Sequence, residues 1–155
     1  MIVNFNSLSD DSRIWVYGSE TILTDTHEKI ISQDLSHFLE NWEYHQNKLK
    51  ASFRFFKNRF IIVALDDAEF EVGGCSMDSL QRLIQEFELK LGLSLLSRLN
   101  IFCMIGDSVE CYTSSELHKY ASDDTLFYDL TIQKKKDLSK WLKPIKDGWC
   151  TIFIL

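Results

Sequence analysis

Hydrophobic positions along the chain follow two periods, which separate predicted strands from predicted helices. Residues 13–19 are aromatic and β-branched up to Gly18 and predict a short strand. Over residues 25–44, apolar side chains recur every three or four positions, the spacing of one helix face. This stripe consists of Ile31, Leu35, Phe38 and Trp42. Asp25 and Glu28 resemble a capping box and mark the predicted start of the helix.

A β-hairpin is predicted for residues 49–67. Two β-rich segments, 49–56 and 59–67, flank Lys57-Asn58, a connection short enough for a two-residue turn. Phe56 would then pair with Arg59, and one face of the hairpin would be almost wholly apolar and would meet the helices. That face would carry Phe53, Phe55, Phe60, Ile62 and Ala64.

A second helix and a fourth strand follow a pair of glycines. Gly73 and Gly74 break the chain, Ser76 is the expected N-cap, and a helix is predicted for residues 77–91. The apolar segment 100–105 predicts another strand. The order strand–helix–strand–strand–helix–strand is that of a ferredoxin-like α+β fold, an antiparallel sheet with two helices on one face.

The whole chain, residues 1–155, is expected to form a single domain. Residues 13–105 would be the ferredoxin-like core, and residues 106–155 a C-terminal α/β extension that packs on it. A strand is predicted for residues 126–132 and a helix for residues 136–142, before Pro144. The apolar tail WCTIFIL would cover the exposed sheet face or add a strand at a sheet edge.

The sheet face opposite the helices is the predicted interaction surface. With a two-residue hairpin turn, this face would present Ile61 and Val63 beside Trp15 and Tyr17. Such an apolar face needs cover from the C-terminal segment or from a second copy of the chain, and the second case predicts a homodimer. An RNA-stacking platform is disfavoured, because the third strand offers aliphatic residues where RNA-binding sheets have aromatic ones.

Composition and charge exclude several classes of function. The chain has 155 residues, 45% of them hydrophobic, as in a soluble globular domain. Its 17 Lys and Arg against 23 Asp and Glu give a net charge of −6, which disfavours binding to nucleic acid. No segment has the length and apolarity of a membrane span, and the N-terminus lacks a signal-peptide pattern. We therefore expect a cytoplasmic protein with reduced cysteines.

The predicted topology gathers polar and reactive side chains at one end of the sheet. The first helix ends there with Trp42 and His45, and the third strand ends there with Asp66 and Asp67. The second helix begins at the same end with Gly74, Cys75, Ser76 and Asp78. These residues are therefore the candidates for a functional site.

Three chemical interpretations of this cluster are open. The glycines and the free N–H groups of the second helix could bind a phosphate or carboxylate, although a plain turn explains the same residues and the nearby carboxylates oppose an anion. Cys75 could be a nucleophile, with His45 as its base and Asp66 orienting the base. Asp66, Asp67 and His45, together with Asp78, could hold a divalent cation, but their spacing matches no metal motif.

Motifs of common enzyme classes are missing from the chain. The patterns GxxxxGK[ST], GxSxG, HExxH and GxGxxG do not occur, and the four cysteines form no CxxC pair. We therefore expect no cofactor and no bound metal, and we expect no ATPase activity of the phosphate-loop type.

Two segments resemble a family of small uncharacterised bacterial proteins. The pattern WxxH…LxAS corresponds to Trp42, His45, Leu49, Ala51 and Ser52, and the pattern GCSxD to residues 74–78, with Asp66 between them. The resemblance runs from Arg13 to Arg98. Family members often have Gly after the His, where this chain has Gln46. Many members carry the label "ABC transporter ATPase", which the missing Walker A motif opposes, so the resemblance indicates a site without naming a reaction.

The cluster therefore supports two expectations about function. The first is a small-ligand-binding or interaction domain, with a pocket around His45 and Cys75 that takes a small anionic ligand. Its ligand-binding residues would be Trp42, Gly74, Ser76 and Asp78. The alternative is a cysteine-dependent enzyme that uses Cys75 as nucleophile and His45 as base, with Asp66 as the orienting carboxylate or the main-chain amides of residues 74–76 binding an oxyanion.

Overall fold

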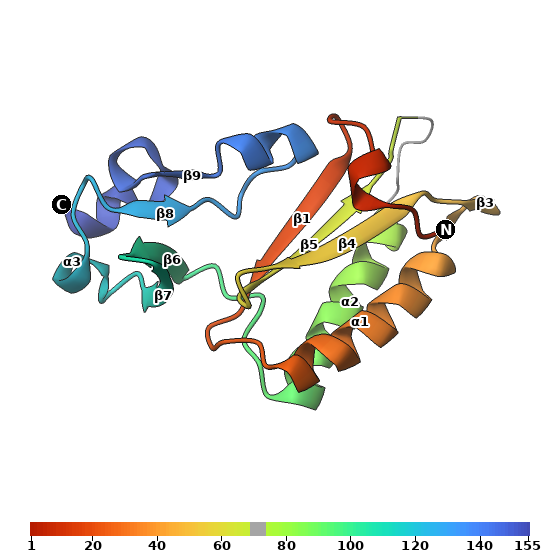
Figure 1. Cartoon of the computed structure of the whole chain (residues 1–155), viewed down its shortest axis with the longest axis horizontal. Coiled ribbons are helices and arrows are strands. Elements are labelled where there is room, and N and C mark those ends of the chain that lie inside the picture. Colours follow the sequence, from red (N-terminus) through yellow and green to blue (C-terminus); the bar gives the residue numbers. More distant parts are fainter. Residues whose placement is uncertain (69–73) are drawn as a thin grey trace.

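A three-stranded antiparallel sheet covered by two helices forms the N-terminal part of the protein. The computed structural model describes residues 1–68 and 74–155. The sheet has the order β1-β5-β4 and consists of β1 (Arg13–Gly18), β4 (Ala51–Phe56) and β5 (Phe60–Leu65). Helices α1 (Asp25–Glu40) and α2 (Gly74–Leu91) lie side by side on one of its faces (Figure 1). Two short strands, β2 (Glu43–Tyr44) and β3 (Asn47–Lys48), form a hairpin between α1 and β4.

Both helices form as predicted, with different ends. The N-cap of α1 is Thr24, whose hydroxyl accepts a hydrogen bond from the His27 N–H (3.1 Å), while His27 Nδ1 accepts one from the Thr24 N–H (3.2 Å). The predicted cap, Asp25, instead lies in the first turn, where its negative charge interacts favourably with the helix dipole. Helix α2 begins at Gly74, so Ser76 lies inside its first turn and is not the N-cap.

The β4–β5 hairpin also forms, but its predicted register is wrong by one residue. Lys57 and Asn58 have φ values of 53° and 55°, and the Arg59 N–H donates to the Phe56 carbonyl (3.1 Å), so the expected two-residue turn is present. Phe56 nevertheless pairs with Phe60, so Arg59 is an extra residue of the connection, outside β5. Because side chains alternate along a strand, this shift exchanges the two faces of β5.

The helix-covered face consequently contains the residues that were predicted for the open face. Ile61 and Val63 are fully buried there, and Trp15 and Tyr17 pack against the same core. The helices contribute Ile31, Leu35, Leu39, Leu80, Ile84 and Phe87 to it. The predicted homodimer surface of Trp15, Tyr17, Ile61 and Val63 is therefore wrong, since these side chains lie between the sheet and the helices.

The opposite face of the sheet is covered by the C-terminal part of the chain and by η1 (Phe5–Ser7). At its centre, the ring of Phe60 lies 5.2 Å from that of Phe102, 5.0 Å from Tyr128 and 5.1 Å from Trp141, centroid to centroid. The Phe102 ring also packs against Gly18, where the Cβ of any other residue would overlap it. Both this face of the sheet and the C-terminal residues that cover it are apolar, because the contact between them is buried inside the protein.

The predicted fourth strand exists but belongs to a second sheet. Strand β6 (Asn100–Ile105) pairs with β7 (Ser108–Thr113) and β8 (Leu126–Tyr128), and β9 (Leu142–Pro144) completes the order β7-β6-β8-β9. These strands lie beyond the β1 edge of the first sheet (Figure 1). A ferredoxin-like sheet would place its fourth strand beside β1. The protein is therefore α+β with antiparallel sheets, but its strand order is not ferredoxin-like.

The C-terminal residues form shorter elements than predicted. The strand expected for residues 126–132 ends at Tyr128, and the expected helix is replaced by η2 (Lys135–Ser139) followed by β9. Short helices α3 (Leu117–Tyr120), η3 (Ile145–Asp147) and η4 (Trp149–Ile154) complete the chain. The apolar tail packs with the second sheet around Cys103 and Phe127 and does not cover the first. Within the described ranges, no helix combines the length and the apolarity that crossing a membrane requires.

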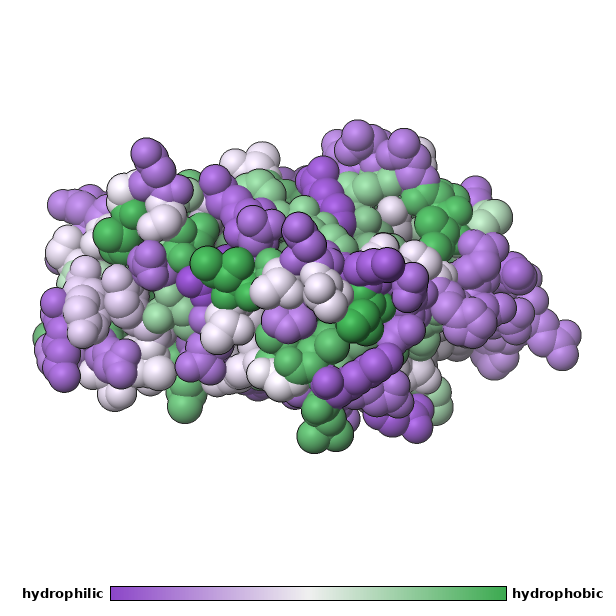
Figure 2. All heavy atoms as spheres, turned by 60° about the horizontal axis from the view of Figure 1, so that its bottom comes forward, coloured by the Kyte–Doolittle hydropathy of each residue, from purple (hydrophilic) through white to green (hydrophobic). Residues whose placement is uncertain are grey.

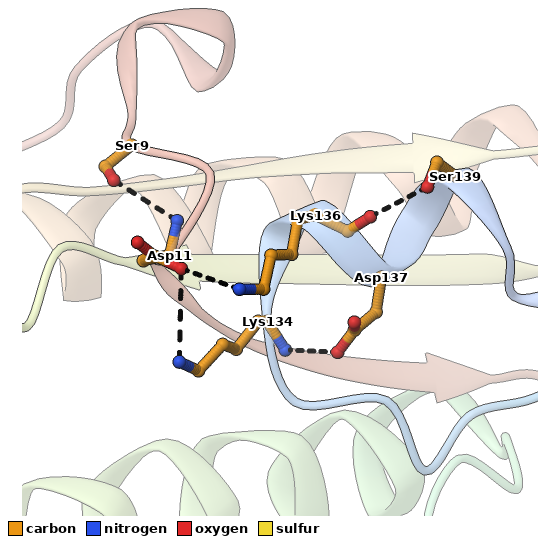
Figure 3. Close-up of polar contacts among 6 residues, drawn as sticks. All are labelled: Ser9, Asp11, Lys134, Lys136, Asp137 and Ser139. Atoms are coloured by element: carbon orange, nitrogen blue, oxygen red, sulfur yellow. Dashed lines mark hydrogen bonds and ion pairs between the residues drawn. The ribbon is translucent and has the colours of Figure 1, made fainter.

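A cluster of polar contacts fastens the segment before β1 to η2 (Figure 3). The Asp11 carboxylate lies 3.1 Å from the Lys136 ammonium and 3.9 Å from that of Lys134. The hydrogen bond from Lys136 lowers the pKa of the Asp11 carboxyl. The Lys135 ammonium donates hydrogen bonds to the carbonyls of Phe5 (3.0 Å) and Leu8 (2.6 Å), in and next to η1. The basic run Lys134–Lys136 therefore has a structural role, because it holds the N-terminal segment against η2.

Candidate functional site

The structure brings the predicted site elements to one end of the sheet without joining their side chains. The end of α1, the β2–β3 turn and the start of α2 all lie at that end (Figure 1), which is strongly hydrophilic on the face shown in Figure 2. His45 is exposed in the β2–β3 turn, Cys75 is exposed in the first turn of α2, and Asp66 is half-buried after β5. Across the described residues, no hydrogen bond or ion pair connects these three side chains.

The remaining predicted site residues have local roles or none that the structure defines. The Asp66 carboxylate accepts the N–H of Ala68 (3.1 Å), which closes a small turn. Asp67, Gly74 and Asp78 are exposed, and Gly73 lies outside the described residues. Among residues 1–68 and 74–155, no group of His, Cys, Asp and Glu has the arrangement of a metal site. His45 and Gln46 form the tight turn between β2 and β3, with φ values of 50° and 66°.

Trp42 lies in the helix-covered core and not in the wall of a pocket at this end. Its side chain is 4% exposed, and its ring centroid lies 5.3 Å from that of Phe38 and 6.0 Å from that of Trp15. Its indole N–H is buried and has no hydrogen-bond partner in the described part of the chain. The pattern residue Trp42 thus links the end of α1 to β1.

The four cysteines differ sharply in accessibility. Cys75 is exposed, Cys111 is half-buried, and Cys103 and Cys150 are buried. Burial raises the pKa of Cys103 to about 12 and those of Cys111 and Cys150 to about 11. Since the thiolate is the reactive form, these three thiols are unreactive at neutral pH in the folded protein.

We expect iodoacetamide at pH 7.5 to alkylate Cys75 first in the folded protein and to leave Cys103 and Cys150 unmodified until it unfolds. Peptide mass spectrometry over a time course measures each site separately. Alkylation in denaturant is the control, because all four thiols then become accessible. Equal labelling of Cys75 and Cys103 in the folded protein would contradict the packing described above.

A cleft of about 640 Å³ lies away from the predicted cluster, between β1 and the second sheet. Trp15, Val16 and Tyr17 line it from β1, and Arg98 lines it from the connection between α2 and β6. Further walls come from the start of β6, from β8 with the residues after it, and from Trp149 of η4. Its volume falls within the range of pockets for small ligands.

The cleft combines aromatic walls with an unpaired positive charge. Of the described residues that line it, only Arg98 is charged, and within the described ranges no carboxylate forms an ion pair with Arg98. A second guanidinium, that of Arg13, lies 5.1 Å from the ring centroid of Trp15. Burial raises the pKa of Tyr17 above its usual range, so its hydroxyl stays neutral. The described lining thus carries one positive charge and no carboxylate, in a chain with a net charge of −6.

Sequence reasoning did not find this cleft. Its walls come from five separate segments, none of which carries a motif, and Trp15 and Tyr17 were predicted on the face of the sheet opposite the helices. Two features of the sequence could have indicated the cleft. The first strand contains aromatic residues, and Arg98 is the one charged residue in the segment 92–99, which is otherwise rich in leucine and serine.

Comparison of the chain with models of protein families, with curated proteins and with solved structures finds no match. The resemblance indicated by residues 42–52 and 74–78 therefore stays a prediction. The fold and the cleft define an α+β protein with a ligand-sized cavity beside the edge of its first sheet.

Proposed function

We propose that the protein binds a small organic anion with an apolar or aromatic body in the cleft beside β1. The observation that carries this proposal is the charge pattern of the cleft, whose described lining includes Arg98 together with aromatic residues and contains no carboxylate. The proposal keeps the small-ligand-binding function expected from the sequence. It moves the site away from His45 and Cys75 to the cleft.

The two parts of the cleft would bind two parts of the ligand. A guanidinium presents paired N–H donors that match a carboxylate or a phosphate, and such charge-assisted hydrogen bonds are stronger than neutral ones. The rings of Trp15 and Trp149 supply apolar surface for the body of the ligand. Neither part is sufficient alone, because Arg98 is exposed to water and the aromatic walls do not select for charge.

We expect 2-naphthoate, a rigid aromatic carboxylate, to bind the wild-type protein and to bind the Arg98→Ala variant at least about tenfold more weakly, because one charge-assisted pair is lost. Isothermal titration calorimetry measures both affinities. Arg82→Ala is the matched control, since Arg82 is exposed on α2 and does not line the cleft. Equal affinities of the wild-type and Arg98→Ala proteins, or no binding to wild type at millimolar 2-naphthoate, would rule the proposal out.

The cysteine-dependent enzyme is the second candidate, because Cys75 is exposed in the first turn of the 18-residue helix α2. This function requires His45 to act on Cys75, so the His45→Ala variant should slow the alkylation of Cys75 below pH 7. An unchanged alkylation rate in that variant would exclude His45 as the base.

A further inference from the structure

The cleft follows the free edge of β1 and not one face of the sheet. Trp15, Val16 and Tyr17 are consecutive residues of the strand, and all three line the cleft. Successive side chains of a strand point to opposite faces. The packing agrees, since Trp15 and Tyr17 pack with the helix-covered core and Val16 with the core on the other side. A single cavity that touches all three residues must therefore lie along the strand edge.

The main-chain groups of Val16 point toward this edge. The Ile14 N–H donates to the Gln133 carbonyl (2.9 Å), away from β5, whereas the Ser19 N–H donates to the Arg59 carbonyl (2.7 Å) at the start of β5. Because the direction of these groups alternates along a strand, the N–H and C=O of Val16 point the same way as those of Ile14. For the residues that the structure describes, pairing of this edge with the segment around Gln133 stops at Ile14.

An edge of this kind has the donors and acceptors that an added strand requires. The cleft occupies the place where a ferredoxin-like sheet would have its fourth strand, which here belongs to the second sheet. A strand in the cleft would meet Tyr17 on the helix-covered side and Tyr128 on the other side, because these two lining residues belong to the two different cores, so alternate side chains would both find apolar walls. Arg98 supplies a positive charge on the same lining.

From these observations we infer that the ligand of the cleft is a short extended peptide with a free carboxylate, which adds as a strand to the edge of β1 at Val16. This inference rests on the proposed function, since it names the class of anion that the cleft takes. Main-chain hydrogen bonds to Val16 give the peptide its orientation, and Arg98 binds its carboxylate. A simple aromatic acid uses only the second of these contacts.

The test uses the acetylated tetrapeptide Ac-Ala-Val-Ala-Val with a free C-terminal carboxylate. We expect its C-terminal amide to bind at least about tenfold more weakly to the wild-type protein, and Arg98→Ala to remove this difference. Hydrogen exchange measured by NMR follows the Val16 amide, which should exchange at least about tenfold more slowly with the peptide bound. The Arg82→Ala variant is again the control.

Two further peptides, N-methylated at adjacent residues, test strand pairing directly. In a paired strand only alternate amides point to the neighbouring strand, so one methylation should abolish binding and the other should be tolerated. Equal affinities of the two methylated peptides, or an unchanged exchange rate at Val16, would overturn the inference. Protection of Val16 that rises with protein concentration in the absence of peptide would also overturn it, because a second copy would then occupy the edge.

The outcome for the small anion separates the two proposals. Binding of 2-naphthoate that depends on Arg98, together with no binding of any peptide, would leave the proposed function intact and reject the peptide. If neither 2-naphthoate nor the peptide binds at millimolar concentration, both proposals are rejected.

Discussion

Replacing Phe60 with Ala is expected to lower the free energy of unfolding by about 3–5 kcal/mol, the usual cost of emptying a buried aromatic site. Phe60 is fully buried, and its ring contacts Phe102, Tyr128 and Trp141 from the C-terminal part of the chain. The lost ring leaves a cavity whose walls are rigid aromatic groups and therefore collapse poorly. Urea unfolding at pH 7, followed by fluorescence and by circular dichroism, measures the change.

The control for this variant is Leu89→Ala. Leu89 lies on α2 with 88% of its surface exposed, so its truncation should change the free energy of unfolding by less than about 0.5 kcal/mol. The same experiment tests the predicted single domain, because coincident transitions with both probes indicate that the two sheets unfold together. A loss below about 1 kcal/mol for Phe60→Ala would mean that the sheets do not share this core.

Asp129→Asn is the second variant with a large expected effect. We expect it to lower the free energy of unfolding by about 2–3 kcal/mol at pH 7. The Asp129 carboxylate is 11% exposed and lies 2.9 Å from the Lys143 ammonium, while its other oxygen accepts hydrogen bonds from the N–H and hydroxyl of Thr131. The amide leaves a half-buried ammonium group without its counter-charge. Thermal and urea unfolding of both proteins measure the difference.

The effect of this substitution should depend on pH. Burial alone would raise the pKa of Asp129, but hydrogen bonds from Thr131 and Lys143 outweigh it and lower the pKa below its usual value of 3.8. A lowered pKa in the folded state gives stability that is present above the unfolded pKa and is lost as the pH falls. The difference in free energy of unfolding between the wild-type and Asp129→Asn proteins should therefore become smaller below about pH 4.

Asp124→Asn is the matched control for the charge pair. Asp124 also lies 3.0 Å from a lysine, Lys146, but it is 83% exposed, so solvent screens the interaction. We expect no measurable change of stability and no narrowing with pH. An equal loss in the two variants would show that burial of Asp129 does not set the strength of its ion pair.

Local patterns were enough to predict the elements of residues 13–105, because each depends on near neighbours in the sequence. The stripe of Ile31 and Leu35 predicted α1, and the turn residues Lys57 and Asn58 predicted the hairpin. The side on which each strand packs could not be derived in the same way. All of Phe60–Leu65 is apolar, so alternation carries no information about its faces, and the single extra residue Arg59 decides them.

The site was harder to predict than the elements, because it depends on where the fourth strand goes. The sequence of Asn100–Ile105 is equally suited to the edge of β1 and to a sheet with the C-terminal strands. In the structure this segment, β6, pairs with β7 and β8. The edge of β1 is therefore left without a fourth strand and lines the cleft. The elements that carry His45 and Cys75 lie at one end of the first sheet, but sequence spacing does not determine whether side chains in one region touch.

The middle strand β5 makes the unfolded chain prone to aggregation. All six of its residues are buried, and the segment FIIVAL contains no charge, no proline and no glycine. Segments of this composition stack into the dry interfaces of amyloid-like fibrils when they are exposed. Charged residues flank the segment at Arg59 and Asp66, the usual position of gatekeepers against such stacking. The two layers that cover the sheet thus also protect the protein from aggregation, and uncovering either one exposes this segment to other chains.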